Sequence, residues 1–285
     1  MRLTRRWVLA WLLLVLVLPA SGAEIGTGLL WRVESAQGRI SYLFGTMHTH
    51  DARVTTFSPA LESAITQCDL FMPELASGGS PAMLFLPSGT LRDHLNGEEL
   101  ELLLQRADAY AMRESIALRT KPWLLAVMLG RPDASGLPTL DELLVDLATR
   151  KGRKIEGLED ASLHFAAMDG LAMTDQLALL RVTLKQTQEE KQAAFEQVLD
   201  AYLTRRATQV AAMDERLSGE GLPPGLWAKV RKLLIDDRNA RMAERMISRM
   251  QQASVFVAVG ASHLPGEGGL VTRLRQAGYR VEAIE

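Results

Sequence analysis

The sequence predicts an α/β fold with a mixed, largely parallel sheet at its core and a large helical insertion. Short apolar runs rich in β-branched and aromatic residues lie near both ends of the chain, at 29–45, 69–75 and 254–284. Most of the region between 84 and 250 instead has apolar residues at helical spacing. Near the start, a strand, a helix and a second strand follow one another, which favours parallel strands.

The first elements are a hairpin and a strand-helix-strand unit. The runs at 29–35 and 38–45 are separated by a short turn that contains Gly38 and are expected to pair. Ser58 is a suitable N-cap and Pro59 a suitable first residue for the helix that follows. The run at 69–75 then predicts a short strand.

The middle of the chain is predicted to be mostly helical. From 84 to 131 leucines such as Leu100, Leu103 and Leu104 form an apolar stripe. Thr139 is expected to cap a further helix that ends at Gly152, and a strand is expected at 154–157.

Helical spacing returns between 160 and 250, with a break at 218–225. Methionines recur there at helical spacing and are expected to fill the core. They are Met242, Met246 and Met250. The chain ends with a predicted strand at 254–260, a helix at 268–278 and a strand at 279–284.

The first 23 residues have the pattern of a secretory signal peptide. Arginines precede an apolar stretch from Trp7 to Leu18, and Ser21 and Ala23 are the small residues typical of a cleavage site. A membrane anchor is the alternative, but the stretch is shorter than the ~20 residues that span a bilayer. We therefore expect residues 1–23 to be removed, residues 24–285 to form one domain, and the protein to be secreted, into the periplasm in a bacterium.

Composition excludes some classes of function. A net charge of −2 provides no basic surface for nucleic acid. After signal cleavage no membrane span is expected. The single cysteine, Cys68, cannot form an internal disulfide and is expected to be a small buried residue.

Two similar motifs place histidines after predicted strands. His48 follows Gly45 in "GTMH", and His263 follows Gly260 in "GASH". Ligands bind beyond the carboxyl ends of strands in open α/β sheets. Glycine at such a position lets the chain turn sharply and lets a ligand approach the backbone.

Two glutamates come at or just past further strand ends, so four strands can direct polar groups to one crevice. They are Glu74 and Glu159. Imidazole and carboxylate together suit Mn²⁺, Co²⁺ or Zn²⁺, and a metal-bound water or a free carboxylate can act in hydrolysis. The alternative is that each histidine makes a local structural hydrogen bond and that Glu74 is merely solvated.

Arg238 is a further candidate, because an arginine at an acidic crevice can orient a carboxylate or stabilise an oxyanion. Its alternative is a surface ion pair with Asp236 or Glu244. The sequence context of His94 and His164 is helical or pre-helical, and both are interpreted as structural or surface residues.

Taken together, these stretches resemble the TraB/GumN (TraB/PrgY) family, to which the animal Tiki proteases belong. The similar segments are "YLFGTMH", "LFMPEL", "TLDELLVDLATRKGRKIEGLED", "DDRNARMAERM" and "VFVAVGASHLPGEGGLVTRLRQAGYRV". The resemblance implies a fold akin to the erythromycin esterases and the haem-binding ChaN-like proteins. It also implies a central trio of His48, Glu74 and His263, with Glu159 and Arg238 in supporting positions.

The resemblance implies a divalent-metal-dependent hydrolase, with a peptide or protein as substrate. Our hypothesis is that His48, Glu74 and His263 bind Mn²⁺, Co²⁺ or Zn²⁺, with catalytic roles for Glu74, Arg238 and Glu159. In many relatives a Thr or Ser and then a Gln follow the position of Glu159, whereas Asp160, Ala161 and Ser162 follow it here.

Two other functions remain open at this point. One is a protein that binds a peptide, haem or a metal in the same crevice without turnover, and the other is hydrolysis of an ester.

Overall fold

A six-stranded mixed sheet forms the centre of the computed structural model, which describes residues 28–75, 79–132 and 136–285. The strand order is β4-β3-β5-β2-β1-β6. The strands are β1 (Leu30–Glu34), β2 (Ile40–Thr46), β3 (Leu70–Pro73), β4 (Lys154–Ile155), β5 (Val255–Gly260) and β6 (Arg280–Ala283).

Five of these strands run in the same direction, and β4, β3, β5 and β2 form a continuous parallel set, whereas β1 is antiparallel to its neighbours β2 and β6. The hairpin and the largely parallel sheet are therefore confirmed. Strand β5, the last strand but one in the sequence, lies between β2 and β3, so the ends of β2 and β5 lie side by side: Thr46 pairs with Gly260. The strand expected at 154–157 is only two residues long.

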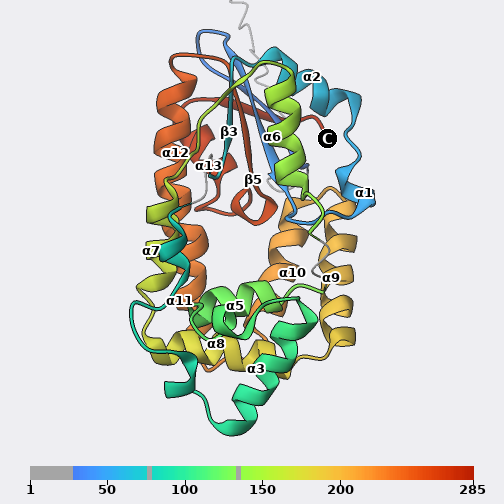
Figure 1. Ribbon diagram of the computed structural model, residues 1–285. Helices are drawn as coiled ribbons and strands as arrows, with labels where there is room; N and C mark the ends of the chain where they lie inside the picture. The colour runs from blue at the N-terminus through green and yellow to red at the C-terminus, as the bar shows by residue number, and fades with distance from the viewer. Residues whose placement is uncertain (1–27, 76–78, 133–135) are drawn as a thin grey trace, which may run out of the picture.

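Helices cover both faces of the sheet. In Figure 1, α12 and α13 lie on one side and α2 and α6 on the other. These helices are α2 (Pro59–Gln67), α6 (Leu140–Arg150), α12 (Asp237–Met250) and α13 (Leu270–Gln276). Ser58 caps α2 and Thr139 caps α6 through their side-chain oxygens, as predicted.

The helical insertion extends from the carboxyl edge of the sheet as an arch, with α7 and α11 on one side, α9 and α10 on the other, and α3, α5 and α8 at the far end (Figure 1). Its longer helices are α3 (Gly97–Ala109), α5 (Pro122–Leu129), α7 (Ala161–Asp169), α8 (Met173–Lys185), α9 (Gln188–Leu203), α10 (Ala207–Gly219) and α11 (Leu226–Arg231). Shorter helical segments are α1 (Ala52–Thr55), α4 (Glu114–Ala117), η1 (Pro81–Leu84), η2 (Leu91–Asp93) and η4 (Ala261–His263). The π-helical turn η3 (Lys232–Asp236) joins α11 to α12.

The main core lies between the sheet and its flanking helices. Phe71 of β3 and Phe256 of β5 are fully buried and stack with their ring centroids 5.4 Å apart. The methionines of α12 and Cys68 are also buried, as predicted. Burial raises the pKa of the Cys68 thiol to about 12, so this cysteine stays protonated and is an inert core residue.

The predicted signal peptide, residues 1–23, lies outside the described residues and stays a prediction, as does the start of the domain at residue 24. No helix in the parts of the chain that the structure describes is long and apolar enough to span a membrane.

We expect Phe71→Ala to lower the free energy of unfolding by about 3–5 kcal/mol, because the substitution leaves a cavity against Phe256. Leu203→Ala is the control, since Leu203 is exposed at the end of α9, and its change should stay within about 0.5 kcal/mol. Urea unfolding followed by circular dichroism measures both values. A loss below about 1 kcal/mol for Phe71→Ala would contradict the packing described here.

Candidate functional site

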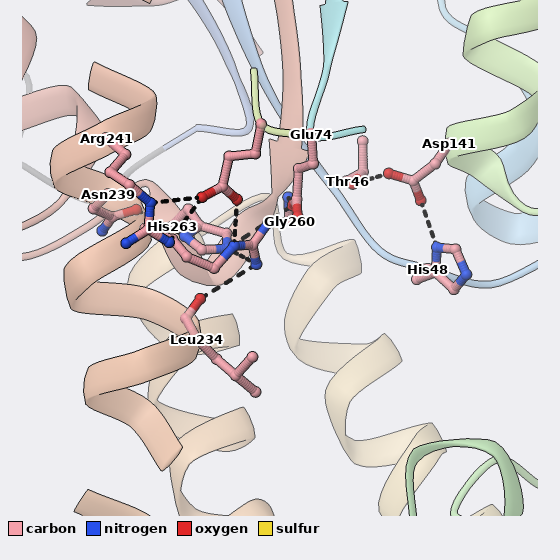
Figure 2. A network of polar contacts seen from close by, with 11 residues as sticks. Thr46, His48, Glu74, Asp141, Leu234, Asn239, Arg241, Gly260 and His263 are labelled. Atoms are coloured by element: carbon pink, nitrogen blue, oxygen red, sulfur yellow. Dashed lines mark hydrogen bonds and ion pairs between the residues drawn. The ribbon is translucent and has the colours of Figure 1, made fainter. Parts of the chain in front are cut away.

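Polar side chains from several strand ends meet in one crevice at the carboxyl edge of the sheet. Glu74 directly follows β3, His48 follows β2, and His263 lies in η4 after β5. Figure 2 shows Glu74 between His263 on one side and the pair of His48 and Asp141 on the other. His48 and Glu74 line the same pocket, whereas His263 is buried beside Glu74, with 3.8 Å between His263 Nε2 and Glu74 Oε1, and does not line that pocket.

The two motif glycines make this convergence possible in different ways. A Cβ on Gly45 would lie 2.7 Å from the Leu264 side chain and 3.1 Å from the Ala261 backbone, so glycine lets η4 pack against β2. The amide of Gly260 donates a 2.7 Å hydrogen bond to Glu74 Oε1. Glycine therefore serves close backbone packing at one position and the approach of a carboxylate at the other.

Arg238 of α12 is the centre of a buried charge network. Its Nε donates to Glu159 Oε2 at 2.6 Å, and its Nη2 donates to Glu74 Oε2. Nη1 donates to the carbonyl oxygen of Leu234, which lies in the π-helical turn before α12. The guanidinium side chain is only 5% exposed, so the surface ion pair considered from the sequence does not form.

Glu159 lies behind Glu74 and away from solvent. Its side chain is 1% exposed and also accepts two hydrogen bonds from Arg241, at 3.0 and 3.1 Å. Two arginines therefore neutralise a carboxylate that is cut off from water, as a buried charge requires. In this position Glu159 holds Arg238 rather than facing the crevice.

His263 is held as a neutral imidazole in one tautomer. Its Nδ1 lies 2.7 Å from Asn239 Oδ1, and its Nε2 lies 3.4 Å from Arg238 Nη1. Since a guanidinium can only donate, Nε2 accepts, and Nδ1 donates to the amide oxygen. Burial lowers the pKa of His263 to about 4, which keeps the ring uncharged at neutral pH.

Glu74 stays ionised. Burial alone would raise its pKa, but His263, which becomes protonated in the acid range, the guanidinium of Arg238 and the amide of Gly260 outweigh burial and lower the pKa to about 2. A carboxylate with so low a pKa has little tendency to accept a proton at neutral pH. Glu74 is thus better suited to accept hydrogen bonds than to act as a general base.

His48 forms a dyad with Asp141 on the opposite side of the crevice. His48 Nδ1 lies 3.2 Å from Asp141 Oδ2, and Thr46 Oγ1 donates to Asp141 Oδ1 at 2.6 Å. Asp141 is in the first turn of α6, and the amide of Leu140 donates to the carbonyl of Thr49 at 2.7 Å. That bond ties the segment after β2 to the start of α6 and brings the histidine to the aspartate.

The crevice contains a pocket of about 630 Å³. Its polar lining is Thr46, His48, Glu74, Asp141, Glu142 and His164. The side chain of His48 is 54% exposed and that of Glu74 is 24% exposed, so both reach a ligand in the pocket.

Four polar residues of this pocket, Thr46, Asp141, Glu142 and His164, were not among the sequence candidates, and Asp141 and His164 carry the chemistry considered below. Asp141 lies in the first turn of the helix that Thr139 caps. Acidic residues are common at that position in helices, so the sequence gave no sign that Asp141 has a functional role. His164 was interpreted as structural or surface. A histidine five residues after Glu159, in the first turn of the helix that follows it, was the available signal for it.

The predicted metal trio of His48, Glu74 and His263 is not assembled as a metal site. Among the described residues, no group of three or more His, Cys, Asp or Glu side chains is arranged to hold a metal ion. His263 Nε2 and Glu74 Oε1 are 3.8 Å apart, but Arg238 contacts both residues. A cation bound there would lie against the guanidinium charge, so the residues in this arrangement do not fit a metal.

Residues 29–283 of this chain match the model of a known protein family, the TraB/PrgY/gumN family. The chain belongs to this family. The expected resemblance is thereby confirmed over nearly the whole described structure. No solved structure gave a match.

Curated relatives of this TraB/PrgY/gumN chain include metalloproteases. The chain is 26% identical over 302 residues to Metalloprotease TIKI1 of Danio rerio, covering 85% of this chain and 60% of that protein. It is 24% identical over 323 residues to Metalloprotease TIKI2 of Xenopus tropicalis, covering 93% of this chain and 61% of that protein. The chain spans about three fifths of the length of these relatives.

We expect Arg238→Gln to lower the free energy of unfolding by about 3–5 kcal/mol, because it leaves Glu74 and Glu159 without their shared cation. Arg245→Gln on the same helix is the matched control. Arg245 also pairs with a glutamate, but its side chain is 44% exposed, and its loss should cost at most about 1 kcal/mol. Equal losses in the two variants, measured by urea unfolding, would contradict the buried network.

Proposed function

We propose that this chain is an exported hydrolase of peptide bonds whose catalytic centre is the crevice between His48 and Glu74. The observation that carries the proposal is the dyad of His48 and Asp141 in a pocket opposite a fixed carboxylate. The relatives named metalloproteases support a peptide as the substrate class. Export, to the periplasm in a bacterium, rests on the signal peptide predicted at residues 1–23.

His48 is suited to be the general base. A carboxylate can only accept, so His48 Nδ1 carries the proton that is shared with Asp141 Oδ2. In the neutral ring the other nitrogen, Nε2, is then the one that can take a proton from a water molecule as that water attacks the peptide carbonyl. The bond from Thr46 to the second oxygen of Asp141 fixes the carboxylate, and thereby the tautomer and the direction of the ring.

Glu74 is suited to bind the substrate. Its carboxylate is ionised, partly exposed and held by Arg238 and Gly260. It can accept a hydrogen bond from a peptide N–H, which orients the scissile bond toward the water activated by His48. Four polar contacts engage Arg238 within the protein, so we assign it to positioning Glu74 rather than to direct contact with an oxyanion.

The relatives' name suggests metal dependence, and the resemblance led us to expect Mn²⁺, Co²⁺ or Zn²⁺. Because Arg238 already contacts Glu74 and His263, an ion could bind there only if the guanidinium moved away. The protein's own residues supply a base, a fixed anion and a pocket without that change.

We expect His48→Ala to lower kcat for a peptide substrate by about 10²- to 10⁴-fold, because a general base is lost. Asp141→Asn should also lower kcat, since an amide can donate to Nδ1 and favour the wrong tautomer. The controls are His94→Ala, at an exposed position, and Asp146→Asn, whose side chain on the same helix α6 is 57% exposed.

The mature protein is assayed with a panel of fluorogenic peptides and a matched panel of esters. Full peptidase activity in a folded His48→Ala variant would contradict the proposal. Peptide binding without turnover by the wild-type protein would favour a binding function instead, and turnover of esters alone would favour an esterase.

Removal of metal ions tests whether the proposed peptidase activity depends on a bound metal. We expect the purified mature protein to contain less than one equivalent of divalent metal by mass spectrometry and to keep its activity after treatment with EDTA, because Arg238 takes the cation position. Activity that is lost with EDTA and restored by Mn²⁺, Co²⁺ or Zn²⁺ would show instead that a metal displaces Arg238.

A further inference from the structure

His164 is a histidine of the crevice to which the mechanism above gives no role. It lies in α7, which begins directly after Glu159, and lines the same pocket as His48 and Glu74. Its ring packs edge-on against Phe165 at 5.6 Å, and Phe165 in turn contacts Trp123 at 5.8 Å between ring centroids. These contacts anchor this part of α7 against α5.

The two ring nitrogens of His164 have different surroundings. Nδ1 is buried and has no hydrogen-bond partner. Nε2 also has no partner among the described residues, but it is not one of their buried atoms. Leaving a buried N–H without an acceptor costs about 1–3 kcal/mol, and such orphaned N–H groups are rarer than unfilled acceptors. The proton therefore belongs on Nε2, the ring nitrogen that is not among the buried, unpartnered atoms of this pocket-lining residue.

His164 is also expected to be uncharged. Burial lowers its pKa, and the positive charge of Arg238 lowers it further. A neutral imidazole with its proton on Nε2 is a hydrogen-bond donor that does not compete with His48 for a proton. Such a donor can stabilise the negative charge that develops on a carbonyl oxygen during attack.

We propose that His164 donates its Nε2–H to the carbonyl oxygen of the scissile peptide bond. Water attacks the carbonyl carbon, His48 Nε2 takes the water proton, and the electron pair of the C=O bond moves to the oxygen that His164 stabilises. When the C–N bond breaks, that pair returns and the protonated His48 gives its proton to the leaving amine. This inference rests on the proposed peptidase function. His164 would be the hydrogen-bond donor to the oxyanion, a role that Arg238 does not fill because its own contacts hold it.

The tautomer is the first test and needs no activity. The mature protein is labelled with ¹⁵N-histidine, and the His164 signals are assigned by comparison with His164→Gln. We expect the Nε2–H tautomer at pH 7.5. A proton on Nδ1, or a doubly protonated ring, would overturn the inference.

Kinetics are the second test. We expect His164→Ala to lower kcat by about 10²- to 10³-fold with KM changed less than about threefold, as for loss of an oxyanion donor. His164→Gln keeps an N–H donor and should recover at least about tenfold of the loss, whereas His164→Phe, which fills the site without a donor, should not. The exposed His94→Ala is the control.

The outcomes for this inference and for the proposed function are distinct. If the wild-type protein cleaves peptides and His48→Ala does not, but His164→Ala is as active as wild type, the role of His164 is wrong and the peptidase assignment stands. Equal kcat in His164→Gln and His164→Phe would also contradict the role. If the wild-type protein cleaves no peptide, the proposed function fails, and the tautomer still decides whether His164 presents a donor to the pocket.

Discussion

The buried guanidinium of Arg238 is the interaction on which the crevice depends. It joins α12 to the residues that follow β3 and β4, because one side chain binds both Glu74 and Glu159. Taking these charges out of water is unfavourable unless all of them are paired. A network with two carboxylates and a second arginine meets that condition, and it fixes Glu74 as an ionised group at the edge of the pocket.

The π-helical turn before α12 contributes to this arrangement. Short π-helical segments occur frequently at functional sites, where they change the direction of side chains. Here the carbonyl of Leu234, within that turn, accepts a hydrogen bond from Arg238 at 3.3 Å. Asn239, the next residue of α12, holds His263, so one turn of helix organises two sides of the crevice.

Much of the fold is visible in the sequence because it is local. The hairpin, the capped helices α2 and α6, and the strand ends that carry His48, Glu74 and His263 all follow from apolar runs, N-caps and glycines. The insertion of β5 between β2 and β3 depends on contacts between distant parts of the chain. No local pattern reveals it, and it is what brings the two Gly-x-x-His segments together.

The site was predicted less completely for the same reason. Asp141 meets His48 because a hydrogen bond between Thr49 and Leu140 joins the segment after β2 to the start of α6. These two residues are 91 positions apart in the sequence. The role of Arg238 also depends on tertiary structure: sequence spacing cannot show that its partners are buried glutamates rather than Asp236 or Glu244. The metal trio expected from the resemblance stays a prediction, whereas the structure places a guanidinium between two of its members.

The most direct test of this account is a crystal structure of the mature His48→Ala variant with a bound peptide substrate. The account predicts the scissile bond in the pocket between the position of His48 and the carboxylate of Glu74, with Arg238 still bound to Glu74. A peptide bound on another surface, or a metal ion between Glu74 and His263 with Arg238 displaced, would contradict it.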